Sequence, residues 1–234
     1  MKKLAIFDID GTLTKTNAVD NVCYIKATQR FILPSFDTFE EESFPHFTDS
    51  AILLEIYKQC KDRLPTEAEK LEFKTYYLDL LKECHEQNPA YFAPIKGAHQ
   101  VIDYLKSKGW EVAMATGCWM ESAQLKLNFA GLDFGSTLIS TASSALTRHD
   151  IMQNAIDGIK ASTGINSFDH TVYIGDGIWD FKTCELMNVP FVGIDAEDSE
   201  RKRLLLGDAI KLNDYSDLNQ VEQLLTTATV PKSA

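Results

Sequence analysis

The sequence predicts an α/β fold with a doubly wound parallel sheet, and three observations support this. An apolar run, "LAIF" at residues 4–7, ends in an acidic loop near the N-terminus. From about residue 94, apolar strands alternate with amphipathic helices across short connections, which is typical of parallel sheets. Between about residues 15 and 93, helix signals occur without strand-like runs. We therefore expect a Rossmann-like core at 1–15 and 94–234, with an inserted helical cap at 16–93.

The inserted segment is predicted to hold three helices, at residues 18–31, 49–60 and 66–88. The third is the best defined, because Pro65 precedes a capping box formed by Thr66 and Glu69. Its apolar spacing predicts a buried face made of Ala68, Leu71, Leu78 and Leu81. The segment is also rich in aromatic residues, which we expect mainly to pack the helices together.

In the core, five further strands are predicted, at residues 110–116, 136–140, 170–175, 189–195 and 208–212. The helices between them are predicted at residues 96–109, 120–131, 148–162 and 179–188. The first of these helices has Ala98, Val101, Ile102 and Leu105 on one face, and Gly109 marks its end. Thr147 and Asp150 form a capping signal for the helix at 148–162.

Composition limits the classes of partner. The 234 residues are 44% hydrophobic and carry a net charge of -11 with no basic run, which argues against nucleic acid. No apolar run approaches the length of a membrane span. The five cysteines form no C-x-x-C pair, so neither a zinc site nor a disulfide framework is indicated. We expect a soluble cytoplasmic protein without nucleic-acid or membrane partners, and the oligomeric state stays open.

Polar groups follow several predicted strands, where the carboxyl edge of a parallel sheet holds ligands. Asp8 and Asp10 end the first strand, and such closely spaced carboxylates repel each other. An EF-hand calcium loop is excluded, because its glycine stands sixth whereas Gly11 stands fourth in "DIDG". In "GDGIWD", Asp176 ends a strand and Asp180 follows one helical turn later. Several carboxylates meeting in one crevice favour a hard divalent cation, and Mg²⁺ fits best.

The stretches "FDIDGTLT", "MATG", "TRHDIM" and "IGDGIWD" resemble, in this order, the four motifs of the haloacid dehalogenase superfamily of phosphatases and phosphotransferases. The resemblance covers residues 1–15 and about 94–213 of the core, and the inserted helices match only as a cap placed between the first two motifs. It implies that Asp8 is the nucleophile and a metal ligand. It also implies that Asp10 is the general acid and base and binds the metal through its backbone carbonyl.

For the other motifs, the resemblance implies that Thr116 hydrogen-bonds the phosphoryl group and that Asp176 and Asp180 serve the metal, the latter directly or through another ligand. Arg148 would offset charge between the nucleophile and the phosphate, a position at which the family more often has lysine. Phosphate binding is accordingly expected at Gly11, Thr116, Gly117 and Arg148.

The function predicted from these residues is Mg²⁺-dependent hydrolysis of a small phosphorylated metabolite through an aspartyl phosphate. Three alternatives stay open: a phosphotransferase or phosphomutase of the same superfamily, a phosphate-binding module that has lost turnover, and a receiver-like phosphoacceptor. Phosphomutases of the superfamily usually carry a histidine shortly after the first motif, and "TKTNAVDNV" has none. The cap is expected to set substrate specificity, and the substrate itself is not predicted.

Overall fold

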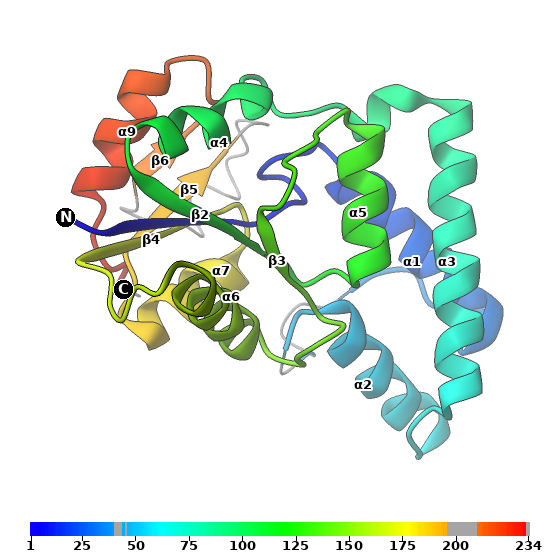
Figure 1. The fold of residues 1–234 in the computed structure, drawn as a ribbon. Coiled ribbons are helices and arrows are strands. Elements are labelled where there is room, and N and C mark those ends of the chain that lie inside the picture. The colour runs from blue at the N-terminus through cyan, green and yellow to red at the C-terminus, as the bar shows by residue number, and fades with distance from the viewer. Residues whose placement is uncertain (40–43, 45, 196–209, 233–234) are drawn as a thin grey trace.

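The computed structural model describes residues 1–39, 44, 46–195 and 210–232 (Figure 1). Its centre is a six-stranded, wholly parallel sheet in the order β3-β2-β1-β4-β5-β6. The strands are β1 (Lys3–Phe7), β2 (Trp110–Ala115), β3 (Leu138–Ser140), β4 (His170–Gly175), β5 (Phe191–Ile194) and β6 (Ile210–Leu212). The order reverses beside β1, as in doubly wound sheets, so the predicted α/β class is confirmed.

The register brings the ends of the central strands together. Phe7 of β1 stands opposite Met114 of β2 on one side and Ile174 of β4 on the other. The backbone N–H of Asp8 then donates to the carbonyl of Ile174 at 2.9 Å. The residues that follow β1, β2 and β4 therefore meet at the carboxyl edge of the sheet.

Helices cover both faces of the sheet (Figure 1). The helices of the core are α4 (Ala98–Ser107), α5 (Met120–Phe129), α6 (Arg148–Thr163), α7 (Ile178–Met187) and α9 (Leu218–Thr227). One face packs Ala5 and Phe7 against apolar residues of α4 and α9, and the other packs Leu4 and Ile6 against α6 and α7. The buried face of α4 is the one that the sequence predicts: Ala98, Val101, Ile102 and Leu105.

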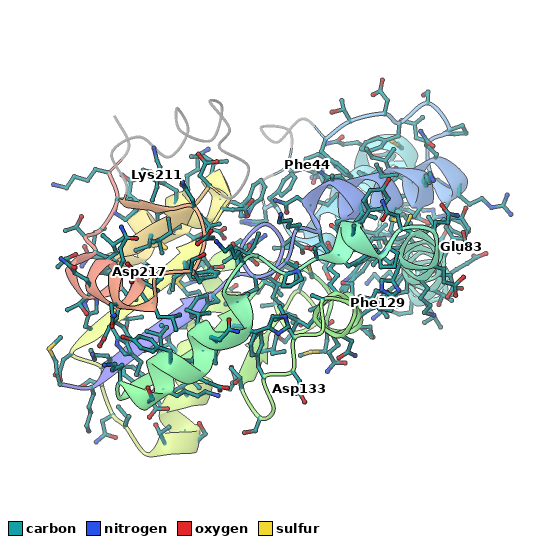
Figure 2. The ribbon with its side chains drawn as sticks, turned by 90° about the horizontal axis from the view of Figure 1, so that it is seen from above. Phe44, Glu83, Phe129, Asp133, Lys211 and Asp217 are labelled. Atoms are coloured by element: carbon teal, nitrogen blue, oxygen red, sulfur yellow. The ribbon has the colours of Figure 1, made fainter. Side chains whose placement is uncertain are left out.

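The segment between β1 and β2 is helical. It consists of α1 (Asn17–Phe31), α2 (Asp49–Lys61), α3 (Glu67–Gln87) and the 3-10 turn η2 (Pro89–Phe92). Seen from above, these helices lie to one side of the molecule, with Glu83 of α3 far from Asp217 and Lys211 of the core (Figure 2). Helix α5 lies beside α3 and η2, so it stands between the sheet and the inserted helices (Figure 1).

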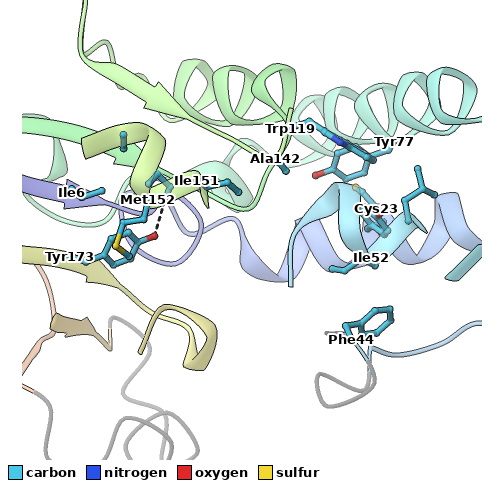
Figure 3. Close-up of a cluster of buried hydrophobic side chains, with 14 of the residues drawn as sticks. Ile6, Cys23, Phe44, Ile52, Tyr77, Trp119, Ala142, Ile151, Met152 and Tyr173 are labelled. Atoms are coloured by element: carbon cyan, nitrogen blue, oxygen red, sulfur yellow. Dashed lines mark hydrogen bonds between the residues drawn. The ribbon is translucent and has the colours of Figure 1, made fainter. Parts of the chain in front are cut away.

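Continuous apolar packing joins the inserted helices to the core. Figure 3 shows the cluster running from Ile6 and Tyr173 at the sheet to Trp119 and Tyr77 beside α1. The ring of Tyr24 stacks on that of Trp119 with centroids 5.9 Å apart. Because this packing crosses the junction, the start of α1 and the start of α2 are held above the carboxyl edge of the sheet.

The buried face of α3 agrees with the prediction at Leu81 and differs from it at Ala68 and Leu71, which are exposed. The predicted capping box of Thr66 and Glu69 is present, but Leu71 is 63% exposed. The buried residues are Phe73, Tyr77, Leu80 and Leu81. The aromatic pair at positions i and i+4 removes more apolar surface from water than the smaller Ala68 and Leu71 would, so it turns that face toward α1. The sequence analysis also missed η2 and α9.

No helix within the described ranges combines the length and apolar composition that a membrane crossing requires.

Candidate active site

Three carboxylates gather at the carboxyl edge of the sheet. Asp8 follows β1, Asp176 follows β4, and Asp180 lies in the first turn of α7. Each is buried, and each offers one oxygen that lies within 4.8 Å of the other two. Gly175 permits the close approach of α7, because a Cβ at this position would lie 2.4 Å from Oδ2 of Asp180. The sequence predicted these three as metal ligands, and the fold brings them together.

Arg148, at the start of α6, reaches into this cluster. Its Nη1 donates to Oδ2 of Asp8 at 3.1 Å and to Oδ1 of Asp180 at 3.2 Å, and its Nε donates to the carbonyl of Phe47 at 3.1 Å. Burial lowers the pKa of the guanidinium, but the charges of Asp8 and Asp180 outweigh burial and raise it. Arg148 is therefore a fixed cation beside the predicted nucleophile, whatever its role there.

The charge in the cluster is still unbalanced. Burial is the main cause that raises the pKa of Asp180 well above its ordinary value, followed by the charge of Asp8. Arg148 opposes this shift without cancelling it. Buried carboxylates in such surroundings retain a proton unless a cation neutralises them. Three carboxylate oxygens in one place form a hard donor set that suits Mg²⁺.

The loops around the cluster are tightly built. Gly11 has a φ of +67°, and a Cβ there would lie 2.1 Å from Oδ2 of Asp176. At Gly117, a Cβ would lie 2.5 Å from Nη2 of Arg148. Thr116 is buried, and its hydroxyl accepts from the backbone N–H of Cys118 at 3.4 Å. These predicted phosphate-binding positions all border the cluster or its loops, and their roles stay predictions.

Asp10 lies in a network that the sequence analysis missed. Its Oδ1 accepts from the hydroxyl of Thr16, and its Oδ2 accepts from Sγ of Cys118 at 2.7 Å and from Nζ of Lys126 at 2.9 Å. Burial raises the pKa of Asp10, but the Lys126 ammonium and the bonds from Cys118 and Thr16 outweigh it, so the net shift is downward.

Lys126 also forms an ion pair with Asp20 of α1, and its side chain is 0% exposed. Burial lowers the pKa of Lys126, but the charges of Asp10 and Asp20 outweigh it and raise that pKa well above its ordinary value. The residue lies on the buried stripe of α5 with Ala123 and Leu127. A lysine inside an apolar helical stripe was the signal that could have revealed it, although its partners are distant in sequence.

Lys126→Met is expected to destabilise the fold by about 3–5 kcal/mol, because it leaves Asp10 and Asp20 buried without their cation. Urea denaturation at neutral pH measures this loss. Adding Asp20→Asn removes one of the two stranded carboxylates, so the double variant should recover part of the stability. A loss below about 1 kcal/mol for Lys126→Met would show that the pair contributes little.

A cavity of about 470 Å³ opens above the cluster, between the core and the inserted helices. From the core it is lined by Asp8, Asp10, Gly117, Arg148, Asp176 and Trp179, among others. From the inserted segment it is lined by Asn17, Asp20, Asn21, Tyr24, Phe39, Phe47 and Asp49, among others. The carboxylate cluster thus forms the floor of a chamber large enough for a small metabolite.

Asp49, at the start of α2, is a second carboxylate that sequence reasoning missed. Its backbone N–H donates to the carbonyl of Gly117 at 2.8 Å, and its Oδ2 accepts from the N–H of Trp119 at 2.8 Å. Burial, with the charge of Asp20, raises the pKa of Asp49 to about 7. The residue joins the inserted helices to the loop after β2, directly beside the cavity.

The parallel sheet and its acidic edge define an α/β core with a candidate active site beneath the inserted helices. The sequence profile of the haloacid dehalogenase-like hydrolases matches residues 5–194. The chain belongs to this family, which confirms the resemblance of its motifs and the expectation of an enzyme of the hydrolase class.

Solved structures share the fold across almost the whole chain. A β-phosphoglucomutase from Clostridium difficile aligns with a TM-score of 0.69 and 16% identity, covering 97% of this chain and 98% of its own. A hydrolase from Pseudomonas syringae gives a TM-score of 0.68, 18% identity and coverages of 95% and 99%. A HAD-type hydrolase from Bacillus subtilis, bound to magnesium, gives a TM-score of 0.59, 13% identity and coverages of 96% and 99%. Among curated proteins, none matches the sequence.

Proposed function

We propose that this protein is a Mg²⁺-dependent phosphomonoester hydrolase that works through an aspartyl phosphate on Asp8. The observation that carries the proposal is the meeting of three buried carboxylates and one arginine at the floor of the cavity: Asp8, Asp176, Asp180 and Arg148. This arrangement supports the proposal, because a carboxylate that could attack phosphorus lies beside two further carboxylates that could hold a metal and a cation that could bind phosphate.

The carboxylates of Asp8, Asp176 and Asp180, with the backbone carbonyl of Asp10, would hold the magnesium ion. When bound, the ion would neutralise the carboxylates and polarise the phosphoryl oxygens. The carboxylate cluster suits Mg²⁺, because three buried oxygen donors lie close together and the raised pKa of Asp180 indicates unbalanced negative charge. The magnesium in the Bacillus subtilis relative agrees with this choice.

The chain's own residues can perform both halves of the reaction. A carboxylate oxygen of Asp8 forms the new bond to phosphorus, and the guanidinium of Arg148 offsets the charge of the phosphate. Asp10 would give a proton to the departing alcohol and then take one from the water that attacks the aspartyl phosphate. The lowered pKa of Asp10 favours the second duty, and the first requires that the charge of the bound phosphate raise that pKa. Thr116 and Gly117 close the loop beside the phosphoryl position.

Transfer to a second substrate is the other candidate, because the same aspartyl phosphate serves both reactions. The fold likeness to a β-phosphoglucomutase keeps this candidate open. The sequence after the first motif favours hydrolysis, since it lacks the histidine usual in the mutases and places Asp20 in a buried ion pair with Lys126 instead. A sugar phosphate that is isomerised without release of inorganic phosphate would favour transfer.

Hydrolysis of p-nitrophenyl phosphate is expected to require Mg²⁺ and to stop in excess chelator. Without a cation, the clustered carboxylates repel the phosphate dianion. Nitrophenol release by the purified protein, with and without chelator, measures this dependence. Adding Mg²⁺ beyond the chelator should restore the rate, which controls for unfolding. Undiminished turnover in excess chelator would contradict the metal assignment.

A further inference from the structure

The cavity has a second end, above the carboxylate floor, and its chemistry bears on the leaving group. This inference rests on the proposed function, because it assumes that a phosphomonoester occupies the floor. The inserted helices supply this end, through α1, α2 and the aromatic residues between them. Its charges therefore decide which alcohol can leave from the phosphate.

Among the described residues, none that line this end of the cavity is a free cation. Arg148 is the one basic side chain among the described residues that line the cavity. Its Nη1 and Nε are already bound to Asp8, Asp180 and the carbonyl of Phe47. A leaving group with a second carboxylate or phosphate would therefore bury its charge without a partner, which is costly.

Asp49 is an acid that can bind a cationic leaving group, because an ammonium beside it favours the ionised form over the protonated one. It is 7% exposed and lines the cavity. Its Oδ2 is held by the N–H of Trp119 and, at 3.5 Å, by the hydroxyl of Ser122. Its Oδ1 accepts no hydrogen bond from the part of the chain that the structure describes. Hydrogen bonds to Oδ2 thus hold the Asp49 carboxyl group in place, and Oδ1 is left to accept a hydrogen bond from a ligand.

The surroundings of Asp49 suit a small cation. Asp20 lines the same end, and Lys126 and Tyr77 bind it from behind. The rings of Tyr24, Phe39 and Phe47 are part of the lining, and aromatic rings attract ammonium groups as well as methylene chains. Asn21 adds a neutral polar group to the lining, whereas the side-chain amide of Asn17 donates to Oδ2 of Asp176 at 2.7 Å.

We propose that the cavity selects phosphomonoesters of small amino alcohols, with the substrate ammonium bound to Asp49. In the reaction, Asp8 forms a bond to phosphorus as the ester P–O bond breaks. The alkoxide takes its proton from Asp10, and the amino alcohol departs with its ammonium unchanged. Water then attacks the aspartyl phosphate, which releases inorganic phosphate and restores Asp8, while Asp10 regains its proton.

Three esters of similar length test the selectivity: 3-aminopropyl phosphate, butyl phosphate and 2-carboxyethyl phosphate. Phosphate release in Mg²⁺ gives kcat/KM for each. The aminopropyl ester should exceed the butyl ester by about 10- to 100-fold, as expected for a hydrogen bond between charged groups. The carboxyethyl ester should be the poorest of the three. Equal values for aminopropyl and butyl phosphate would overturn the proposal.

The variant Asp49→Asn tests whether Asp49 causes the preference for the aminopropyl ester. Asparagine keeps an acceptor for the N–H of Trp119 but loses the charge, so the ratio between the aminopropyl and butyl esters should fall toward one. Glu55→Gln is the matched control, because it removes a carboxylate from the same helix, where Glu55 binds Gln59 outside the cavity. Glu55→Gln should have the same ratio of kcat/KM between the two esters as the wild-type protein. An unchanged ratio in Asp49→Asn would overturn the proposal.

p-Nitrophenyl phosphate separates the two claims. If the wild-type protein hydrolyses it in Mg²⁺ without any preference among the alkyl esters, the amino-alcohol inference fails and the proposed function stands. If the folded protein hydrolyses none of these esters, the proposed function fails.

Discussion

Asp8→Asn is expected to fold like the wild-type protein and to lose phosphomonoesterase activity by about 10⁴-fold or more, since it removes the nucleophile. The amide is nearly isosteric with the carboxylate, and its oxygen can still accept the hydrogen bond that Ile9 N–H now gives to Oδ1 of Asp8 at 2.8 Å. Arg148 keeps Asp180 as its partner. The fold therefore survives while the attacking atom is lost.

Thermal denaturation and p-nitrophenyl phosphate hydrolysis check this expectation together. Asp169→Asn is the matched control, because Asp169 precedes β4 at the opposite edge of the sheet, where it binds the N–H of Lys2 at 2.7 Å. The control should retain activity. Near-wild-type activity in Asp8→Asn would mean that another residue attacks phosphorus.

Asp10→Asn is expected to separate the two halves of the reaction. Asparagine cannot supply a proton readily or accept one from water. The nitrophenolate leaving group is already stable, so formation of the aspartyl phosphate from the aryl ester should proceed. Hydrolysis of the aspartyl phosphate should then be slow, because no base activates the water. Rapid mixing should show a burst of about one nitrophenol per active site, followed by slow turnover.

The structure indicates that this variant folds. Lys126 keeps Asp20 as its counter-ion when Asp10 loses its charge, so the buried charges still balance. An alkyl phosphate is the comparison, because its alkoxide must be protonated as it leaves, and here even the burst should vanish. Equal defects on aryl and alkyl esters would show that Asp10 is not the shared acid and base.

The sequence was sufficient to predict the core because its signals are local. An apolar strand that runs into Asp8, and a strand, turn and helix that present Asp176 and Asp180, specify their own places at the edge of a parallel sheet. Arg148 was found in the same way, from the helix that it begins. The structure brings these residues together, and what each of them does stays a prediction.

The features that the sequence did not reveal depend on packing between distant segments. The position of Lys126 on an apolar stripe hints that it is buried, but its pairing with Asp10 and Asp20 depends on how α5 packs in the fold. Asp49 reads as an acid at a helix start, which the helix dipole favours in any protein. The face of α3 was wrong because apolar spacing admits two faces, and contact with α1 selects the one with Phe73 and Tyr77.

Direct trapping of the phosphorylated residue tests the central claim. Asp10→Asn is mixed with Mg²⁺ and p-nitrophenyl phosphate, quenched in acid during the burst, digested and mapped by mass spectrometry. We expect one phosphoryl group on the peptide that contains Asp8, labile to hydroxylamine as an acyl phosphate is. A nitrophenol burst without a phosphoryl group on Asp8, or with it on another residue, would contradict the account.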